Sequence, residues 1–256
     1  MNSARCVLRW LGRIDYGRAW AFQRAWAAAR AEGRRPDALL LLEHPPTYTF
    51  GRSGRREHLR LSEEVCARRG IALYDVDRGG NVTYHGPGQL VGYPILRLAD
   101  YGLDYHGYLR ALEEVLIQAL GALGVPAHRE PGYTGVWVGG AEGTPEKIAA
   151  IGVKVDARGI TSHGFALNVD PDLSYFEGIV PCGIADRRVT SLARLLGRPI
   201  PMEEVVKAVV VAFLRTFRVR PLPREALEKL TKEAEGLIIE VPGVEGGAMR
   251  PMVERY

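Results

Sequence analysis

The segment Arg78–Pro94 is rich in glycine and lies between two apolar runs, and it constrains the fold more than any other stretch of the chain. Ile71–Asp77 leads into it and Leu90–Leu96 leaves it, and both runs have the length and composition of β-strands. Glycines between two strands allow a tight turn and let backbone amides approach a ligand closely. Three side chains that can bind a ligand, those of Arg78, His85 and Gln89, also lie within a span of twelve residues in this segment. The pattern indicates either a plain glycine-rich hairpin or a ligand-binding loop.

Helical and strand-like segments are mixed along the chain without a strict β-α-β alternation. Amphipathic helices are predicted over Tyr16–Glu32, Tyr105–Leu123 and Pro201–Phe217. A second hairpin is predicted from Lys147–Asp156 and Ile160–Val169, which flank a short turn with a glycine. Two hairpins among helices predict an α+β fold with a mostly antiparallel sheet.

Lys147 begins the first strand of the second hairpin. Strict alternation places it on one face with four apolar residues, Ala149, Ile151, Val153 and Val155. A lysine at the end of an apolar face either extends its stem to reach water or serves a ligand. The opposing strand offers three small residues that leave room for a ligand, Ser162, Gly164 and Ala166.

Composition excludes several classes of protein. The 256 residues are 46% hydrophobic, which is enough for one domain with a full core. The net charge of +4 favours an acidic protein partner over nucleic acid, because no basic run with interleaved aromatic residues is present. No apolar run approaches the roughly 18 residues of a membrane span. Cys6, Cys66 and Cys182 are too widely spaced for a disulfide framework or zinc site, so we expect no metal and a reducing, cytoplasmic location.

Four segments resemble the lipoyl(octanoyl) transferases of the biotin/lipoate protein ligase superfamily. They are Arg78–Tyr93, Lys147–Gly152, Ser162–Asn168 and Pro181–Ile184. They occur in the order and spacing of that family, within a resemblance that extends from about Val7 to Gly197. The resemblance implies the superfamily's catalytic fold. We predict a catalytic domain over residues 1–220 and a C-terminal helix with a loose tail over residues 221–256.

The resemblance also implies a reaction, the first step of endogenous protein lipoylation. An octanoyl group moves from octanoyl-acyl carrier protein to the acceptor lysine of a lipoyl domain. The implied acceptors are lipoyl domains of 2-oxoacid dehydrogenase complexes and the glycine cleavage H protein. A thioester is already activated, so a thiolate can take the acyl group without ATP and without any cofactor.

The matching positions imply roles for particular residues. Cys182 is the implied nucleophile, and Lys147 either lowers the pKa of its thiol or relays the proton of the incoming amine. His163 is a candidate for orienting groups in the site. The implied acyl-binding residues are Arg78, Gly79, Gly80, Asn81, Val82, Thr83, Tyr84, His85, Ala150, Ile151, Gly152, Gly164, Phe165 and Ala166.

Alternatives remain open for the residues and for the function. Free cysteine is often a small buried hydrophobe, which is the second interpretation of Cys182. His85 and His163 are equally compatible with structural hydrogen bonding. The competing functions are an ATP-dependent lipoate or biotin ligase, a Cys–His thiol hydrolase and a non-enzymatic module that binds acyl carriers.

Overall fold

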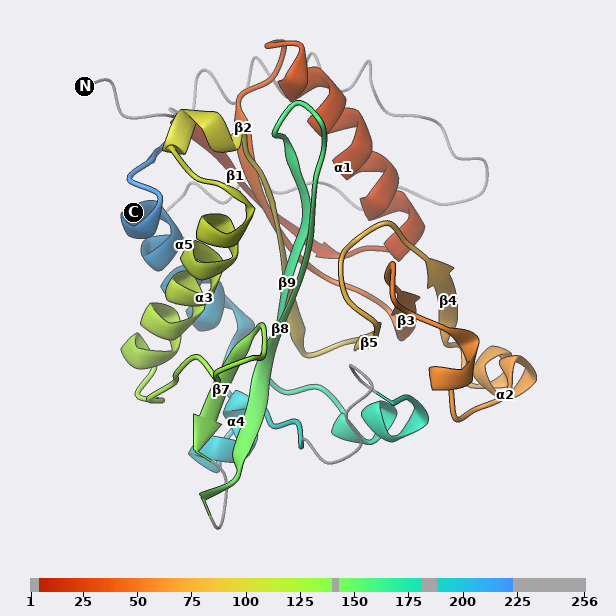
Figure 1. Cartoon of the computed structure of the whole chain (residues 1–256). Helices are drawn as coiled ribbons and strands as arrows, with labels where there is room; N and C mark the ends of the chain where they lie inside the picture. Colours follow the sequence, from red (N-terminus) through yellow and green to blue (C-terminus); the bar gives the residue numbers. More distant parts are fainter. Residues whose placement is uncertain (1–4, 140–142, 181–187, 223–256) are drawn as a thin grey trace.

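The computed structural model describes residues 5–139, 143–180 and 188–222 (Figure 1). The strands are β1 (Arg5–Arg13), β2 (Asp37–Glu43), β3 (Thr47–Phe50), β4 (Ala72–Asp75), β5 (Val82–His85), β6 (Gln89–Ile95), β7 (Val136–Gly139), β8 (Pro145–Val155), β9 (Thr161–Asn168) and β10 (Arg220–Pro221). The α-helices are α1 (Tyr16–Ala31), α2 (Glu63–Arg68), α3 (Tyr105–Ala122), α4 (Leu192–Leu196) and α5 (Met202–Thr216). Three 3₁₀ turns cover Arg56–His58, Leu98–Tyr101 and Leu173–Gly178.

The larger sheet has seven strands in the order β10-β1-β2-β6-β9-β8-β7. In this sheet, the neighbouring strands β2, β6, β9, β8 and β7 pair antiparallel, whereas β1 runs parallel to both β2 and β10. The parallel pair arises because α1 carries the chain from the end of β1 back to the start of β2, which is a crossover connection. The predicted α+β class and the predominantly antiparallel sheet are confirmed. The predicted domain boundary at residue 220 falls inside β10, and residues 223–256 lie outside the described residues.

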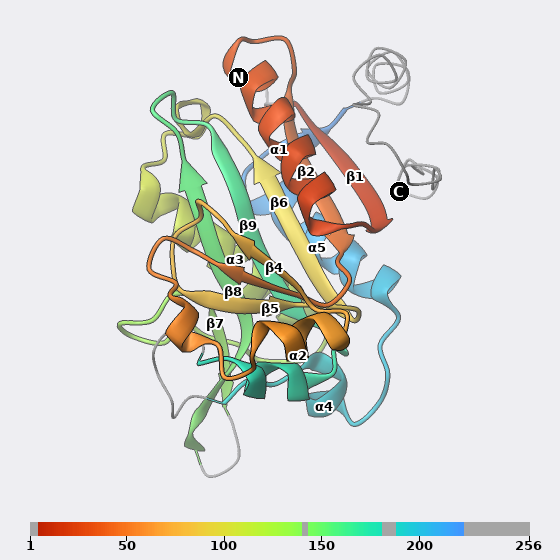
Figure 2. The ribbon, with the colours of Figure 1, turned by 90° about the vertical axis from the view of Figure 1, so that its right-hand side faces the viewer.

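Helices cover both faces of the larger sheet (Figures 1 and 2). Leu39 and Leu41 of β2 belong to the cluster that packs under α3 and α5, whereas Leu40 and Leu42 belong to the cluster under α1. Because both faces of β2 are covered, its sequence is a continuous apolar run without alternation.

The buried face of α1 differs from the predicted one. The sequence predicts a stripe of Trp20, Ala27 and Ala31 with Trp26 flanking it, but of these four only Trp26 is buried. The helix instead buries Tyr16, Ala19, Gln23, Trp26 and Ala29. Gln23 explains the rotation, because its side-chain oxygen accepts a hydrogen bond from the backbone N–H of His163 at 2.9 Å. A polar residue at the centre of a buried face is invisible to a search for apolar periodicity.

A smaller sheet in the order β4-β3-β5 stands beside the larger one and has its own core with α2 (Figure 2). The glycine-rich segment that leaves β4 passes along the larger sheet before it returns to the smaller one as β5. On the way, the N–H of Gly79 donates to the carbonyl of Val153 in β8 at 2.9 Å. This contact joins the two sheets at the place where the site is found.

Candidate functional site

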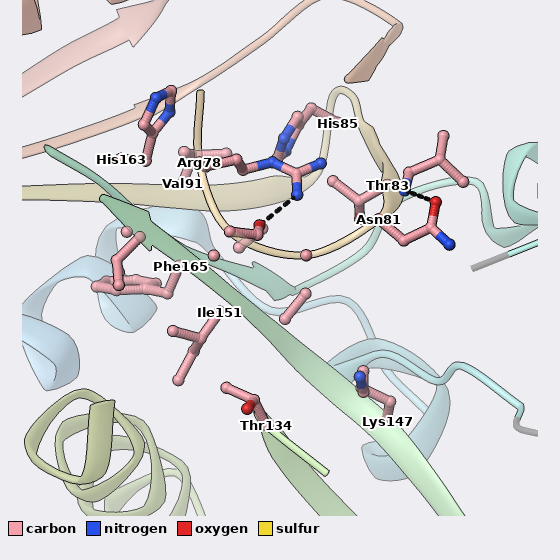
Figure 3. Close-up of a pocket in the computed structure, with 18 of the residues that line it drawn as sticks. Arg78, Asn81, Thr83, His85, Val91, Thr134, Lys147, Ile151, His163 and Phe165 are labelled. Atoms are coloured by element: carbon pink, nitrogen blue, oxygen red, sulfur yellow. Dashed lines mark hydrogen bonds between the residues drawn. The ribbon is translucent and has the colours of Figure 1, made fainter. Parts of the chain in front are cut away.

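A pocket of about 590 Å³ lies between the glycine-rich segment and the β8–β9 hairpin (Figure 3). The predicted site residues that line it are Lys147, Arg78, Gly79, Gly80, Asn81, Val82, Thr83, His85, Ala150, Ile151, Gly152, His163, Gly164, Phe165 and Ala166. Lys147 lies towards one end of β8, and His163 is opposite Val153 towards the other end. The six residue steps from Lys147 to Val153 correspond to about 20 Å. The pocket is therefore elongated along the hairpin.

Tyr84 is not among the residues that line this pocket. Its ring is buried in the core of the smaller sheet, where it stacks on Tyr175 at 4.8 Å between centroids. Neighbouring residues in a strand point to opposite faces, so Thr83 and His85 face the pocket while Tyr84 faces the core. Its implied contact with the acyl group is therefore corrected to a packing contact.

The predicted opposition of the two acyl-binding segments across the hairpin is present in the structure. Ala150 pairs with Ala166, Ile151 with Phe165 and Gly152 with Gly164, which are consecutive positions of the antiparallel ladder. A Cβ on Gly152 would lie 3.1 Å from Cδ of Arg78, so the arginine stem passes close over the strand there. The small residues make room for both the arginine and the pocket.

Gly164 tests how tightly this wall is packed. A Cβ at this position would lie 2.0 Å from the backbone oxygen of Gly92 in β6, and backbone cannot move away cheaply. We expect Gly164→Ala to lower the free energy of unfolding by about 1–3 kcal/mol, as overpacking does. Urea unfolding followed by circular dichroism measures the change.

The matched control is Gly121→Ala in α3, where a Cβ would meet no atom within 4 Å. Because alanine is the better helix former, this variant should gain about 0.5–1 kcal/mol. Equal stability of Gly164→Ala and the natural protein would contradict the tight packing.

Lys147 lies on the opposite face of β8 from the predicted one. The register of β7 against β8 shifts by one residue, so that Val136 is opposite Ala149 while Trp137 is opposite Lys147. This bulge buries both Ile148 and Ala149 in the core under α3. The prediction that Lys147 shares a face with Ala149 is wrong, because alternation holds only where a strand is regular. The bulge instead turns Lys147 into the pocket.

Arg78 is held by backbone and side-chain acceptors. Its guanidinium donates to the carbonyl and to the hydroxyl of Thr49, both at 2.8 Å, and to the carbonyl of Gly79 at 2.9 Å. Arginine cannot lose its charge in a protein, so it contributes a fixed positive charge to the pocket wall.

His85 is fixed in one neutral tautomer by a chain of buried amides. Its Nδ1 donates to the side-chain oxygen of Gln89 at 2.8 Å, and Gln89 in turn donates to the side-chain oxygen of Asn168 at 3.0 Å. Asn168 then donates to the carbonyl of Thr190 at 3.0 Å. Burial, with the nearby His44 and Arg78, lowers the pKa of His85 well below its usual value. Its Nε2 is therefore an acceptor, and the hydroxyl of Thr49 lies 3.5 Å from it.

His163 is also buried, and its backbone is strained. Its φ of +56° lies in the left-handed region that non-glycine residues rarely adopt. Two hydrogen bonds hold it there: its N–H donates to Gln23, and its Nε2 donates to Asp77 at 2.8 Å. Burial lowers the pKa of His163 even though Asp77 opposes this change. The hydrogen bond from His163, together with Lys154, holds the pKa of Asp77 well below its usual range.

Cys182 lies outside the described residues. The chain is described as far as Val180, whose N–H donates to the carbonyl of His58 at 2.8 Å, and again from Arg188. The returning segment pairs directly with Lys147. The N–H of Lys147 donates to the carbonyl of Arg188 at 2.9 Å, and the N–H of Thr190 donates to the carbonyl of Lys147 at 3.0 Å.

Several lining residues are absent from the predicted set. They are Tyr16, Ser53, Gln89, Val91, Tyr93, Tyr105, Leu109, Gly132, Tyr133, Thr134, Trp137, Val153, Asn168, Phe176 and Val189. Gln89 and Asn168 stand inside the motifs and could have been found as polar residues at strand ends. Val91 and Tyr93 also stand inside a motif, and Val153 directly follows one. The others come from more distant parts of the chain, and only the fold brings them together.

Within residues 5–139, 143–180 and 188–222, no helix combines the length and hydrophobicity needed to cross a bilayer. In the same part of the chain, no three His, Cys, Asp or Glu side chains are grouped so that they could hold a metal ion.

Comparison with known proteins gives consistent matches. The model of the lipoyl protein ligase A/B catalytic domain matches residues 15–214. A protein named octanoyltransferase from Chloroflexus aggregans is 52% identical over 212 residues, which are 83% of this chain and 95% of that protein. Another of the same name, from Solibacter usitatus, is 51% identical over 222 residues, 87% of this chain and 97% of that protein.

Solved structures agree on the fold. A bipartite lipoate protein ligase from Thermoplasma acidophilum superimposes with a TM-score of 0.65 at 19% identity, covering 90% of this chain and 92% of that one. A lipoate-protein ligase A bound with ATP superimposes with a TM-score of 0.63 at 18% identity, covering 91% of this chain and 94% of that one.

Proposed function

The chain belongs to the octanoyltransferases of the lipoyl protein ligase A/B catalytic-domain family, and from this premise we propose its donor, its nucleophile and its acceptors. The donor is octanoyl-acyl carrier protein. The acceptors are the lysines of lipoyl domains, in 2-oxoacid dehydrogenase complexes and in the glycine cleavage H protein. The reaction takes place in the cytoplasm, a reducing compartment that suits three widely spaced cysteines.

The elongated pocket carries this proposal. One of its walls is the β8–β9 hairpin, which presents Ile151 and Phe165 beside positions with no side chain or only a methyl group. Such a wall gives an extended acyl chain an apolar surface of narrow width. Lys147 stands towards one end of that wall, where a reacting carbonyl would have to lie.

In the proposed reaction, the Cys182 thiolate attacks the thioester carbonyl of the donor, and the carrier leaves as its own thiol. The acceptor amine then attacks the new thioester on Cys182, an amide bond forms, and the thiolate returns. The amine must lose a proton on the way, and Lys147 is positioned in the pocket to accept it. The backbone hydrogen bond between Lys147 and Arg188 supports a joint role of Lys147 and Cys182 in the reaction, because it joins the segment that follows Cys182 to the lysine.

His85, Arg78 and His163 are assigned supporting roles. Neutral His85 presents an acceptor nitrogen, while the fixed charge of Arg78 and the hydrogen bonds of His163 hold the walls in shape. None of the three has the environment of a group that changes charge near pH 7.

One incubation tests the proposal. Purified protein, octanoyl-acyl carrier protein and apo lipoyl domain are mixed with and without ATP and Mg²⁺, and the mass of the lipoyl domain is followed. We expect octanoylation at the same rate in both arms, because the thioester supplies the activation. Free octanoate with ATP should give no product.

The outcomes separate the candidate functions. Modification that requires ATP and accepts free octanoate would indicate a ligase. Release of octanoate without modification would indicate a hydrolase, and binding of the carrier without any chemistry would indicate a non-enzymatic module.

A further inference from the structure

The ammonium of Lys147 lies over an aromatic ring. Its Nζ is 4.7 Å from the centroid of the Trp137 ring, which is within the range of a cation–π interaction. The two residues are directly opposite each other in the β7–β8 ladder, on the face that the bulge turns towards the pocket. The contact is therefore a consequence of strand register, and it lies inside the site.

Several interactions fix the ring. The backbone of Trp137 exchanges two hydrogen bonds with that of His128, at 2.8 and 3.0 Å, which closes the intervening loop. The Tyr133 ring packs edge-on against it at 5.8 Å between centroids. Gly135, at a φ of +117°, brings the loop so close to β8 that a Cβ would lie 2.6 Å from the carbonyl of Ala149 and 3.5 Å from Cε of Lys147. The ring and the lysine stem are thus held against each other.

We infer that Trp137 is a positioning residue for acyl transfer, whose ring face holds the Lys147 ammonium in the pocket and favours the charged form of this lysine. The inference rests on the proposed role of Lys147 as the group that takes the proton of the acceptor amine. A ring face with negative potential attracts a cation and not a neutral amine. Trp137 therefore makes the neutral amine form of Lys147, the form that takes up the proton, a stronger base than it would be over an aliphatic floor.

Other groups near Lys147 also carry charge. Three titratable side chains lie on the elements that adjoin it: Tyr133, whose ring packs against Trp137, Glu146, which precedes Lys147 in β8, and Arg188, whose carbonyl accepts the N–H of Lys147. Glu146 precedes Lys147 in the strand and points to the opposite face, and the side chain of Arg188 is exposed. The proposed thiolate of Cys182 would favour the ammonium in the same direction as the ring. A test must therefore change the ring alone.

Fluorinated tryptophans at position 137 do this, because each fluorine removes electron density from the ring face while the shape of the ring is nearly kept. The chain has five lysines, so the titration of each can be followed by NMR in protein with ¹³C-labelled lysine, and Lys147→Arg identifies the signal of Lys147. We expect the titration midpoint of Lys147 to fall stepwise from mono- to di- to trifluorotryptophan, by about one pH unit in total. The signal of Lys154, which pairs with Asp77, should not move.

Fluorinated tryptophan at position 26 is the matched control. Trp26 lies on the buried face of α1, and the guanidinium carbon of Arg35 is 5.2 Å from the centroid of its ring, so its fluorination should leave Lys147 unchanged. Trp137→Leu is the second variant, and it should lower the Lys147 midpoint in the same direction. A midpoint that stays constant or rises across the fluorinated series would overturn the inference. The titration midpoint is measured without turnover. The inference about Trp137 can therefore be overturned while octanoyl transfer through Cys182 is upheld, and it can be upheld while that reaction is overturned.

Discussion

Cys182→Ala should lower the rate of octanoyl transfer by roughly 10⁴–10⁶-fold, the scale of loss when a catalytic nucleophile is removed. The reason is that no acyl-enzyme can form, and the acceptor amine must then attack the carrier thioester directly. In the natural protein, octanoyl-acyl carrier protein alone should leave one octanoyl group on the enzyme. Hydroxylamine should remove this group, and peptide mass mapping should locate it on Cys182.

Cys66→Ala is the matched control. Cys66 is fully buried in the core of the smaller sheet, and burial raises the pKa of its thiol. Such a thiol is a poor nucleophile, so this variant should keep its acylation and its turnover. Full activity in Cys182→Ala, or an octanoyl group mapped to another residue, would show that the reaction does not pass through Cys182.

Lys147→Arg should still form the acyl-enzyme but should transfer the octanoyl group about 10²–10⁴-fold more slowly, because general acid–base help is worth that much. Arginine keeps a positive charge that favours the Cys182 thiolate, and it can still lie over the Trp137 ring. It cannot take up a proton from the acceptor amine. Rapid-mixing measurements of acylation and deacylation separate the two steps.

The control for a general effect of added bulk is Lys154→Arg. Lys154 lies further along the same strand, where it pairs with Asp77 at 2.5 Å, and an arginine should pair there equally well. Both half-reactions should then be near normal. A normal deacylation rate in Lys147→Arg would mean that Lys147 acts only through its charge.

Local sequence patterns predicted the helices and strands of this fold well, but they predicted the pairing of the strands less well. The β8–β9 hairpin and α3 follow from apolar periods of two and 3.6 residues, and the aspartates that stand before α1 and α3 in the sequence, Asp15 and Asp104, cap these helices. The parallel pairing of β1 with β2 was not predicted, because it depends on where α1 packs and not on either strand's own sequence.

The candidate site shows the same division. The motifs locate the glycine-rich wall and the hairpin wall, because both are continuous in sequence. The face of Lys147 was predicted wrongly, since the bulge at Ile148 is a property of the pairing between β7 and β8. Trp137 was missed for the same reason. Its proposed role depends on Lys147, the residue opposite it in β8, and the sequence of β7 alone does not reveal which residue lies opposite.

The pairing of β1 with β10 sets an order of events during synthesis. Arg5 is opposite Arg220 in this pair, so the outer edge of β1 meets its partner strand only after most of the chain has been translated. At roughly 5–20 residues per second, a ribosome needs about 10–40 s to cover the distance between them. Until then the first two residues of β1, Arg5 and Cys6, present open backbone donors and acceptors, which other strands can occupy. The start of this strand thus stays open to misassembly long after it has left the ribosome.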